Sequence, residues 1–219
     1  MRRFTGTVTA VALALLILGG QAQAQNMRAG VNAGVSFATL GGDIDQLVGV
    51  SAKTKTGFSA GAFFGVDLSN MFRLQLNGQY VQKGAKFEED GATATFDVPY
   101  IEFLLPVTFL IQIENSSITP RIYAGPSLAF EMSCDIKLEF DGQSETETCE
   151  DTVGNATKST DYGVFFGAGV DFGLGSGELT LDVLYNLGLA DINDSPVENE
   201  TVKNQNLQIL LGYAFLFGN

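Results

Sequence analysis

Residues 162–189 read YGVFFGAGVDFGLGSGELTLDVLYNLGL, and this stretch consists of two alternating runs around a Gly-Ser-Gly turn at 175–177. In the first run, one face carries Tyr162, Val164, Phe166, Ala168, Val170 and Phe172, and the other carries Gly163, Gly167, Gly169 and Asp171. The second run sets Leu179, Leu181, Val183, Tyr185, Leu187 and Leu189 against Thr180, Asp182, Asn186 and Gly188. Alternation of period two is typical of strands with one apolar face, and a short Gly-rich turn is typical of a hairpin. The stretch therefore predicts two antiparallel strands.

The same alternation recurs along the rest of the chain. The segments that share it cover residues 28–37, 58–68, 72–80, 100–111, 121–131, 162–172, 179–189 and 206–217. Each is close to the roughly 9–11 residues that a tilted membrane strand needs, or longer, whereas a helical span needs about 20 apolar residues in a row. We predict an all-β fold, an eight-stranded antiparallel up-and-down transmembrane β-barrel.

The connections between these segments alternate in length. Short ones fall at 69–70, 114–117 and 175–177, and long ones at 39–56, 84–95, 133–160 and 190–203. Short turns on one side and long loops on the other are typical of outer-membrane barrels. We therefore expect the bacterial outer membrane as the location, with both termini periplasmic and the long loops extracellular.

The choice between a membrane barrel and a soluble one depends on which face points outward. A soluble ligand-binding barrel also has eight strands, but it needs an apolar interior. Here the apolar face is large and nearly free of charge, and the opposite face is rich in Gly, Ser and Asn. Eight strands leave an interior only just wide enough for side chains. We expect the small polar face to line the lumen, and a soluble periplasmic ligand-binding barrel stays as an alternative.

The N-terminus has the pattern of a secretory signal peptide. Arg2 and Arg3 precede the apolar run 8–18, and Ala22-Gln23-Ala24 is a small-residue cleavage site. We predict a signal peptide at residues 1–24 and a barrel domain at residues 25–219. The apolar run is too short for a membrane-spanning helix.

The composition excludes several classes of function. After loss of the two N-terminal Arg, ten of the 12 basic residues remain, against 25 acidic ones, which gives a net charge of about −15. Such an acidic chain disfavours nucleic acid as a partner. The absence of His excludes Ser-His-Asp and Cys-His catalysis and His-ligated metals. We predict a protein that is not an enzyme and holds no cofactor or metal. The alternative is an outer-membrane enzyme acting on lipid through acid–base carboxylates.

Several charged residues occupy positions predicted to face the lumen. They are Arg28, Asp67, Arg73, Glu102, Arg121, Glu131, Asp171 and Asp182. Isolated ions in a narrow interior are costly, so these three Arg and five carboxylates are expected to pair in a network that plugs the lumen.

The connection 133–160 contains both cysteines, Cys134 and Cys149. In an oxidising compartment they are expected to form a disulfide, worth roughly 3 kcal/mol for a loop of about 15 residues. The same connection holds seven acidic residues and two Lys, which favours a solvated exposed loop. A cation-binding or partner-binding loop is the alternative, although no D-x-D-x-D-G spacing is present.

Several short motifs resemble the PorT-like outer-membrane barrels of Bacteroidota. They are Tyr100-Ile101-Glu102, YAGPSL at 123–128, YNLGLADI at 185–192 and LGYAF at 211–215. The resemblance implies contact with outer-membrane lipid, and its founding member is implicated in type IX secretion and gliding, so envelope or secretion-machinery proteins are candidate partners. The family usually has Pro two residues after the Glu, whereas here Pro106 comes four after Glu102. We therefore expect a shift or a bulge in the fourth strand.

Overall fold

The computed structural model describes residues 26–43, 49–89, 91–149, 157–193 and 201–218. The predicted signal peptide at 1–24 lies outside these residues. The strands are β1 (Met27–Gly42), β2 (Lys55–Asp67), β3 (Phe72–Glu89), β4 (Ala92–Leu104), β5 (Val107–Leu110), β6 (Ile118–Glu131), β7 (Asp135–Phe140), β8 (Gln143–Thr148), β9 (Thr160–Leu174), β10 (Gly177–Gly188) and β11 (Val202–Phe217).

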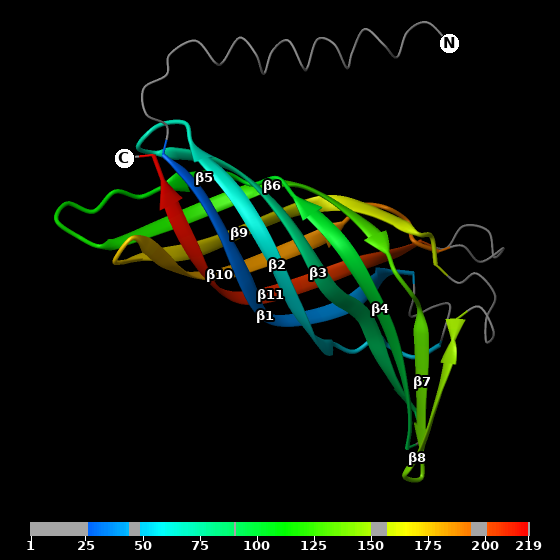
Figure 1. The fold of residues 1–219 in the computed structure, drawn as a ribbon. Helices are drawn as coiled ribbons and strands as arrows, with labels where there is room; N and C mark the ends of the chain where they lie inside the picture. The colour runs from blue at the N-terminus through cyan, green and yellow to red at the C-terminus, as the bar shows by residue number, and fades with distance from the viewer. Residues whose placement is uncertain (1–25, 44–48, 90, 150–156, 194–200, 219) are drawn as a thin grey trace, which may run out of the picture.

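These strands form a closed antiparallel barrel, which confirms the predicted fold (Figure 1). The ring runs β1, β2, β3, β4 with β5, β6, β9, β10 and β11, so β4 and β5 share one of its eight positions. Pairing of β1 with β11, from Met27 opposite Phe217 to Gly42 opposite Val202, closes the ring. The short connections β2–β3, β5–β6 and β9–β10 lie at the same end of the barrel as the start of β1 and the end of β11 (Figure 1). We call this end the short-turn end. The opposite end is the loop end.

The predicted shift in the fourth strand is wrong. Pro106 separates β4 from β5, but Leu104 pairs with Ser127 of β6, and Val107 pairs with Ala124, in one continuous register. The register against β3 is also continuous. Proline removes one N–H from the ladder without adding a residue. Its carbonyl still accepts from the backbone N–H of Gln75 at 3.2 Å, so the strand is interrupted without slipping.

The apolar faces point outward, as the alternation predicts. Val31 is 59 % exposed, Phe166 57 % and Leu211 56 %, while their sequence neighbours face a packed interior. The interior contains the predicted small and polar residues, and also a cluster of large side chains, Leu104, Tyr123, Phe165, Leu184 and Leu210. An outward apolar face and an inward charged one are the reverse of a soluble ligand-binding barrel.

The outward apolar band has the dimensions of a membrane-spanning region. On β1 it runs from Met27 to Phe37, eleven residues, which at about 3.3 Å per residue and about 45° of tilt gives roughly 25 Å. Outer-membrane barrels have an apolar band of about this height. No helix among the described residues has the length and apolar character needed to cross a bilayer.

Two segments predicted as long loops, 84–95 and 133–160, contain β-strands. β3 and β4 continue beyond the band and turn at Gly91, and the β7–β8 hairpin adds to β4 through pairs from Ala92–Phe140 to Asp97–Asp135. Gly91 and Gly142 have φ of 86° and 78°, a conformation that suits glycine in tight turns. We call residues 84–89, 92–97, 135–140 and 143–148 the projecting sheet, which extends from the barrel at its loop end (Figure 1).

The polarity of the two faces reverses between the barrel and the projecting sheet. On β3 the outward positions change from Leu74, Leu76 and Tyr80 to Gln82, Lys86 and Glu88. On the other face of the projecting sheet, Phe87 is 6 % exposed and Ile136 is 3 % exposed. The reversal marks the loop-end boundary of the apolar band, because charged outward residues belong in water.

Candidate functional site

The best candidate site is the charged interior, which divides into two clusters along the barrel axis. The cluster nearer the short-turn end, here called the arginine cluster, comprises Arg28, Arg73, Arg121, Asp67, Asp171, Asp182 and Glu178. These residues come from β1, β2, β3, β6, β9 and β10, so the cluster joins most of the ring.

Asp171 is the centre of the arginine cluster. Its carboxylate accepts from Arg28 at 2.8 Å, from Arg73 at 2.9 Å and from Arg121 at 2.8 Å. Only 1 % of Asp171 is exposed. Three cations around one carboxylate repel one another, and the remaining acids offset this repulsion, since Asp67 accepts from Arg73 at 2.6 Å.

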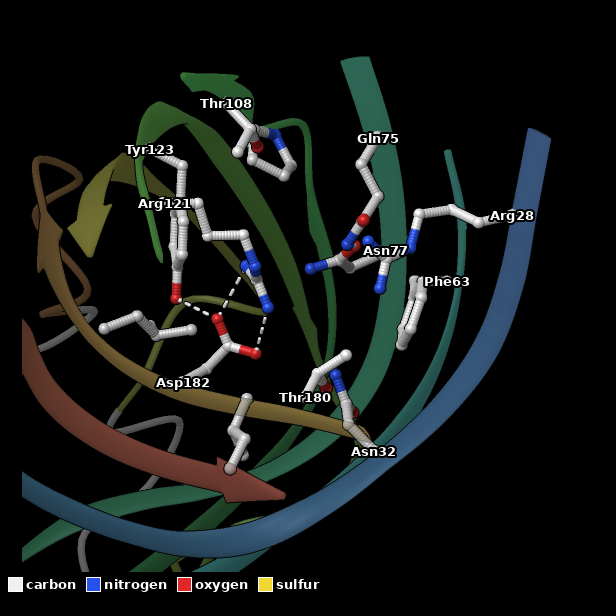
Figure 2. Close-up of a pocket in the computed structure, with 13 residues that line it drawn as sticks. Arg28, Asn32, Phe63, Gln75, Asn77, Thr108, Arg121, Tyr123, Thr180 and Asp182 are labelled. Carbon is white, nitrogen blue, oxygen red and sulfur yellow. Dashed lines mark hydrogen bonds and ion pairs between the residues drawn. The ribbon is translucent and has the colours of Figure 1, made fainter. Parts of the chain in front are cut away.

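Asp182 holds the side of the arginine cluster that faces the aromatic core. Both nitrogens of the Arg121 fork contact its two carboxylate oxygens at 2.8 Å, and the Tyr123 hydroxyl donates to it at 2.9 Å (Figure 2). A two-point guanidinium–carboxylate contact fixes geometry as well as charge. Both carboxylate oxygens of Asp182 are therefore engaged by Arg121 and Tyr123, which disfavours a role for Asp182 as a general acid or base.

The second cluster, here called the lysine cluster, lies toward the loop end. Lys83 contacts Glu102 at 2.8 Å and Asp161 at 3.3 Å, and its ammonium group lies 5.0 Å from the centre of the Tyr100 ring. Glu102 also accepts from the side-chain amides of Gln79 and Asn186, each at 2.8 Å. Glu102 is fully buried and its carboxylate is well satisfied.

The structure places the predicted lumen residues in two groups. Six of the eight lie in the arginine cluster, Glu102 lies in the lysine cluster, and Glu131 lies at the loop end, beside Tyr100 and Thr157. Sequence reasoning missed Lys83, Asp161 and Glu178. Each lies just beyond the end of a predicted strand, so extending the alternation into the connections would have found them.

Side chains fill the interior between the clusters. The cavity beside Asp182 and Arg121 has a volume of about 20 Å³, and Figure 2 shows the side chains that surround it. That is room for about one water molecule. A wider polar hollow of about 390 Å³, lined by Asp67, Arg73 and Glu178 among others, opens at the short-turn end. The arginine cluster therefore separates this hollow from the interior.

The projecting sheet is strongly acidic, and two of its acids contact lysines. Lys53 contacts Glu88 and Lys137 contacts Glu139, each at 2.5 Å. A hydrogen bond from Lys53 lowers the pKa of Glu88, and one from Lys137 lowers the pKa of Glu139. The predicted disulfide between Cys134 and Cys149 is present and closes the base of the β7–β8 hairpin.

Comparison with known proteins agrees with this geometry. The family model described as "Outer membrane protein beta-barrel domain" matches residues 21–194. The fold is similar to Neisserial surface protein A (TM-score 0.52, 15 % identity, 87 % of this chain and 97 % of that one). It is also similar to a major outer membrane protein from Thermus thermophilus (TM-score 0.53, 11 % identity, 89 % of this chain and 100 % of that one). At these identities the likeness concerns the fold alone. The sequence matches no curated protein.

Proposed function

Since the chain belongs to the outer membrane protein beta-barrel domain family, we propose that it is a non-enzymatic barrel that acts by presenting its projecting sheet to a partner. The observation that carries this proposal is the projecting sheet itself. It continues two barrel strands beyond the apolar band, and a disulfide closes its added hairpin. Ordering backbone costs about 1–2 kcal/mol per residue. An ordered extension that crosses no membrane therefore favours a role in holding a surface in a fixed position.

The interior supports a structural rather than a catalytic role. Asp171, Asp182 and Glu102 each contact at least one cation, and the cavity beside Asp182 has room for about one water. A lipid or solute needs a much larger opening near the reacting groups. The clusters therefore act as a plug that ties the strands together.

The proposed class of partner and the proposed orientation in the membrane follow from the resemblance to PorT-like barrels. We propose an envelope accessory role, with secretion-machinery proteins of the type IX kind as the partner class, and with both termini periplasmic. In this orientation the projecting sheet is extracellular and the hollow at the short-turn end faces the periplasm.

Epitope insertion tests the orientation. A short tag between Asp141 and Gly142, at the β7–β8 turn, should be labelled by antibody on intact cells. The matched tag between Gly175 and Ser176, at the β9–β10 turn, should be labelled only after the outer membrane is permeabilised. The reverse pattern would reject this orientation.

Removal of the hairpin tests the binding role. Replacing Asp135–Thr148 with a short Gly-Ser linker removes β7 and β8 but no strand of the ring. The variant should still migrate as a heat-modifiable barrel. In-cell crosslinking from Lys137 should capture a partner in the intact protein, whereas crosslinking from Asn115 at a short turn should not capture that partner. Crosslinking from Thr95 in the shortened variant should lose the partner, and retained capture would show that the hairpin is not needed.

Two assays separate this proposal from the alternatives. Glu102→Ala and Asp182→Ala variants, assayed on membrane lipids, should show the same absence of turnover as the unaltered protein. A turnover that these variants abolish while folding is retained would establish an enzyme. Membrane fractionation should recover the protein only with detergent, and recovery in the aqueous extract would establish the soluble ligand-binding alternative.

A further inference from the structure

The lysine cluster and its surroundings carry an excess of negative charge. Lys83 is its single cation within the described residues and contacts two carboxylates, Glu102 and Asp161. A third carboxylate, Glu131, lies beside the cluster, opposite Tyr100 in the β4–β6 pairing. One positive and three negative charges give a local net charge of −2. Buried charges without compensation are destabilising, so this excess calls for a counter-charge.

No other side chain of the described residues can supply that counter-charge. The chain has no His, and all of its Lys and Arg apart from Arg2 and Arg3 lie in the described residues. Apart from Lys83, seven of them already contact acids elsewhere, and the other two point outward. These nine are Arg28, Arg73, Arg121, Lys53, Lys55, Lys137, Lys158, Lys86 and Lys203.

The positions of three of these lysines show that they do not neutralise the excess negative charge. Lys86 shares its outward face of β3 with Glu88, and Lys203 shares its outward face of β11 with Gln205 and Leu207. Lys55 points inward, but Asp97 already contacts it at 2.5 Å. The excess charge at Glu131 and Asp161 is therefore not offset by a further lysine.

A second observation concerns oxygen atoms that lack a hydrogen-bond donor. Oδ1 of Asp161, Oδ1 of Asn204 and Oε2 of Glu131 are all buried and unpaired. Asp161 and Asn204 are each 2 % exposed. The orientation of the Asn204 amide is fixed, because its nitrogen donates to Asp161 at 3.0 Å, so its free atom is the oxygen.

These atoms belong to one connected group. Asn204 lies within 3.4 Å of the Tyr100 hydroxyl, and Tyr100 lies directly opposite Glu131 on neighbouring strands. Glu131 also shares its face of β6 with Ala129, which lies opposite Asp161 of β9. Free acceptors on two carboxylates and one amide, together with a hydroxyl, are the oxygen ligands that hard cations prefer. The described residues contain no group of three Cys, Asp or Glu placed to hold a metal, so a site here would combine two carboxylates with amide and hydroxyl oxygens.

We propose that Glu131, Asp161 and Asn204 bind one divalent cation of the Ca²⁺ type at the loop end of the lumen, with the hydroxyls of Tyr100 and Thr157 as further ligands. The charge of +2 equals the local excess, whereas a proton on Glu131 would offset only half of it. Ca²⁺ suits the site better than Mg²⁺ because it accepts irregular geometry and more ligands. This inference does not depend on the proposed partner of the projecting sheet.

Calorimetry on the full-length protein in detergent, after removal of metal with EDTA, tests the site with CaCl₂ as the probe. We expect one saturable site per chain. Glu131→Gln and Asp161→Asn each remove one negative ligand, and each should weaken Ca²⁺ binding at least tenfold. Glu139→Gln, which removes an exposed acid of the projecting sheet, should leave the affinity within twofold.

Terbium luminescence locates the bound ion. The chain has no Trp, so excitation at the tyrosine band reaches Tb³⁺ only from tyrosine. Emission should fall at least fivefold in Tyr100→Phe, whereas Tyr213→Phe, on the outward face of β11, should leave it unchanged. Absence of saturable Ca²⁺ binding, or binding that both Glu131→Gln and Asp161→Asn retain, would overturn the proposal. Retained binding would place the ion outside this group of residues.

Discussion

Arg28 of β1 and Asp171 of β9 lie 143 positions apart in the sequence, and a contact of 2.8 Å between guanidinium and carboxylate joins them inside the barrel. Because β11 and β10 lie between these strands in the ring, the pair bridges the lumen rather than a single ladder. Arg73 of β3 contacts the same carboxylate, so Asp171 couples β9 to two strands, β1 and β3, with which β9 forms no ladder. Arg121, the third contact, comes from the neighbouring strand β6.

Removing the charge of Asp171 should destabilise the barrel strongly. Asp171→Asn keeps the shape of the side chain but leaves three buried arginines with less compensation, and loss of one partner of a buried pair costs about 3–5 kcal/mol. Urea unfolding in lipid vesicles should show a loss of this size. Asp141→Asn, in the exposed β7–β8 turn, should change stability by less than about 0.5 kcal/mol. Equal stability of the two variants would contradict a structural role for the cluster.

The filled lumen predicts the electrical behaviour of the protein. An interior with room for about one water beside Arg121 offers no continuous aqueous path. Planar-bilayer recording of the unaltered protein should show no large, stable open channel. Long-lived, high-conductance openings in a preparation shown to be monomeric would rule out the plug.

The sequence predicted the ring well because lipid and lumen impose opposite polarities on alternate residues. It predicted the loop end less well, since polarity no longer follows the same rule outside the apolar band. On β3 the polar residue Glu88 points outward and the apolar Phe87 points inward, the reverse of the order lower on the strand, so the alternation predicts that the strand ends at residue 80. Lys83 and Asp161 follow the lumen rule but lie just beyond the predicted strand ends at residues 80 and 162. The disulfide was predictable because two cysteines allow one pairing.

Close approach of strands explains one of the lumen glycines. A Cβ on Gly34 of β1 would overlap the carbonyl oxygen of Ile209 on β11, an atom that the ladder holds in place. Gly34→Ala should therefore lower stability by about 3 kcal/mol or more, or prevent assembly. Gly78 faces outward, where a Cβ would meet only the Phe103 ring at 3.5 Å, so Gly78→Ala should fold normally. The yield of heat-modifiable barrel distinguishes the two, and normal assembly of Gly34→Ala would contradict the packing seen here.

The disulfide should stabilise the hairpin and not the ring. Replacing both Cys134 and Cys149 with Ala frees a loop with a sequence separation of 15, which corresponds to roughly 3 kcal/mol. Hydrogen exchange should accelerate for backbone amides of β7 and β8, while those of β1 and β11 keep their protection. Loss of protection throughout the barrel would show that the hairpin and the ring unfold as one unit.

A charge on the outward face tests whether that face contacts lipid. Leu211 lies near the middle of the apolar part of β11 and is 56 % exposed. Arg at the middle of a bilayer costs about 2–4 kcal/mol in outer-membrane barrels, so Leu211→Arg should lose this much stability in vesicles. Thr93→Arg, on the projecting sheet between Glu88 and Glu139, should be close to neutral because the new charge stays in water beside two acids. If Leu211→Arg were equally neutral, the outward face would not be in contact with lipid.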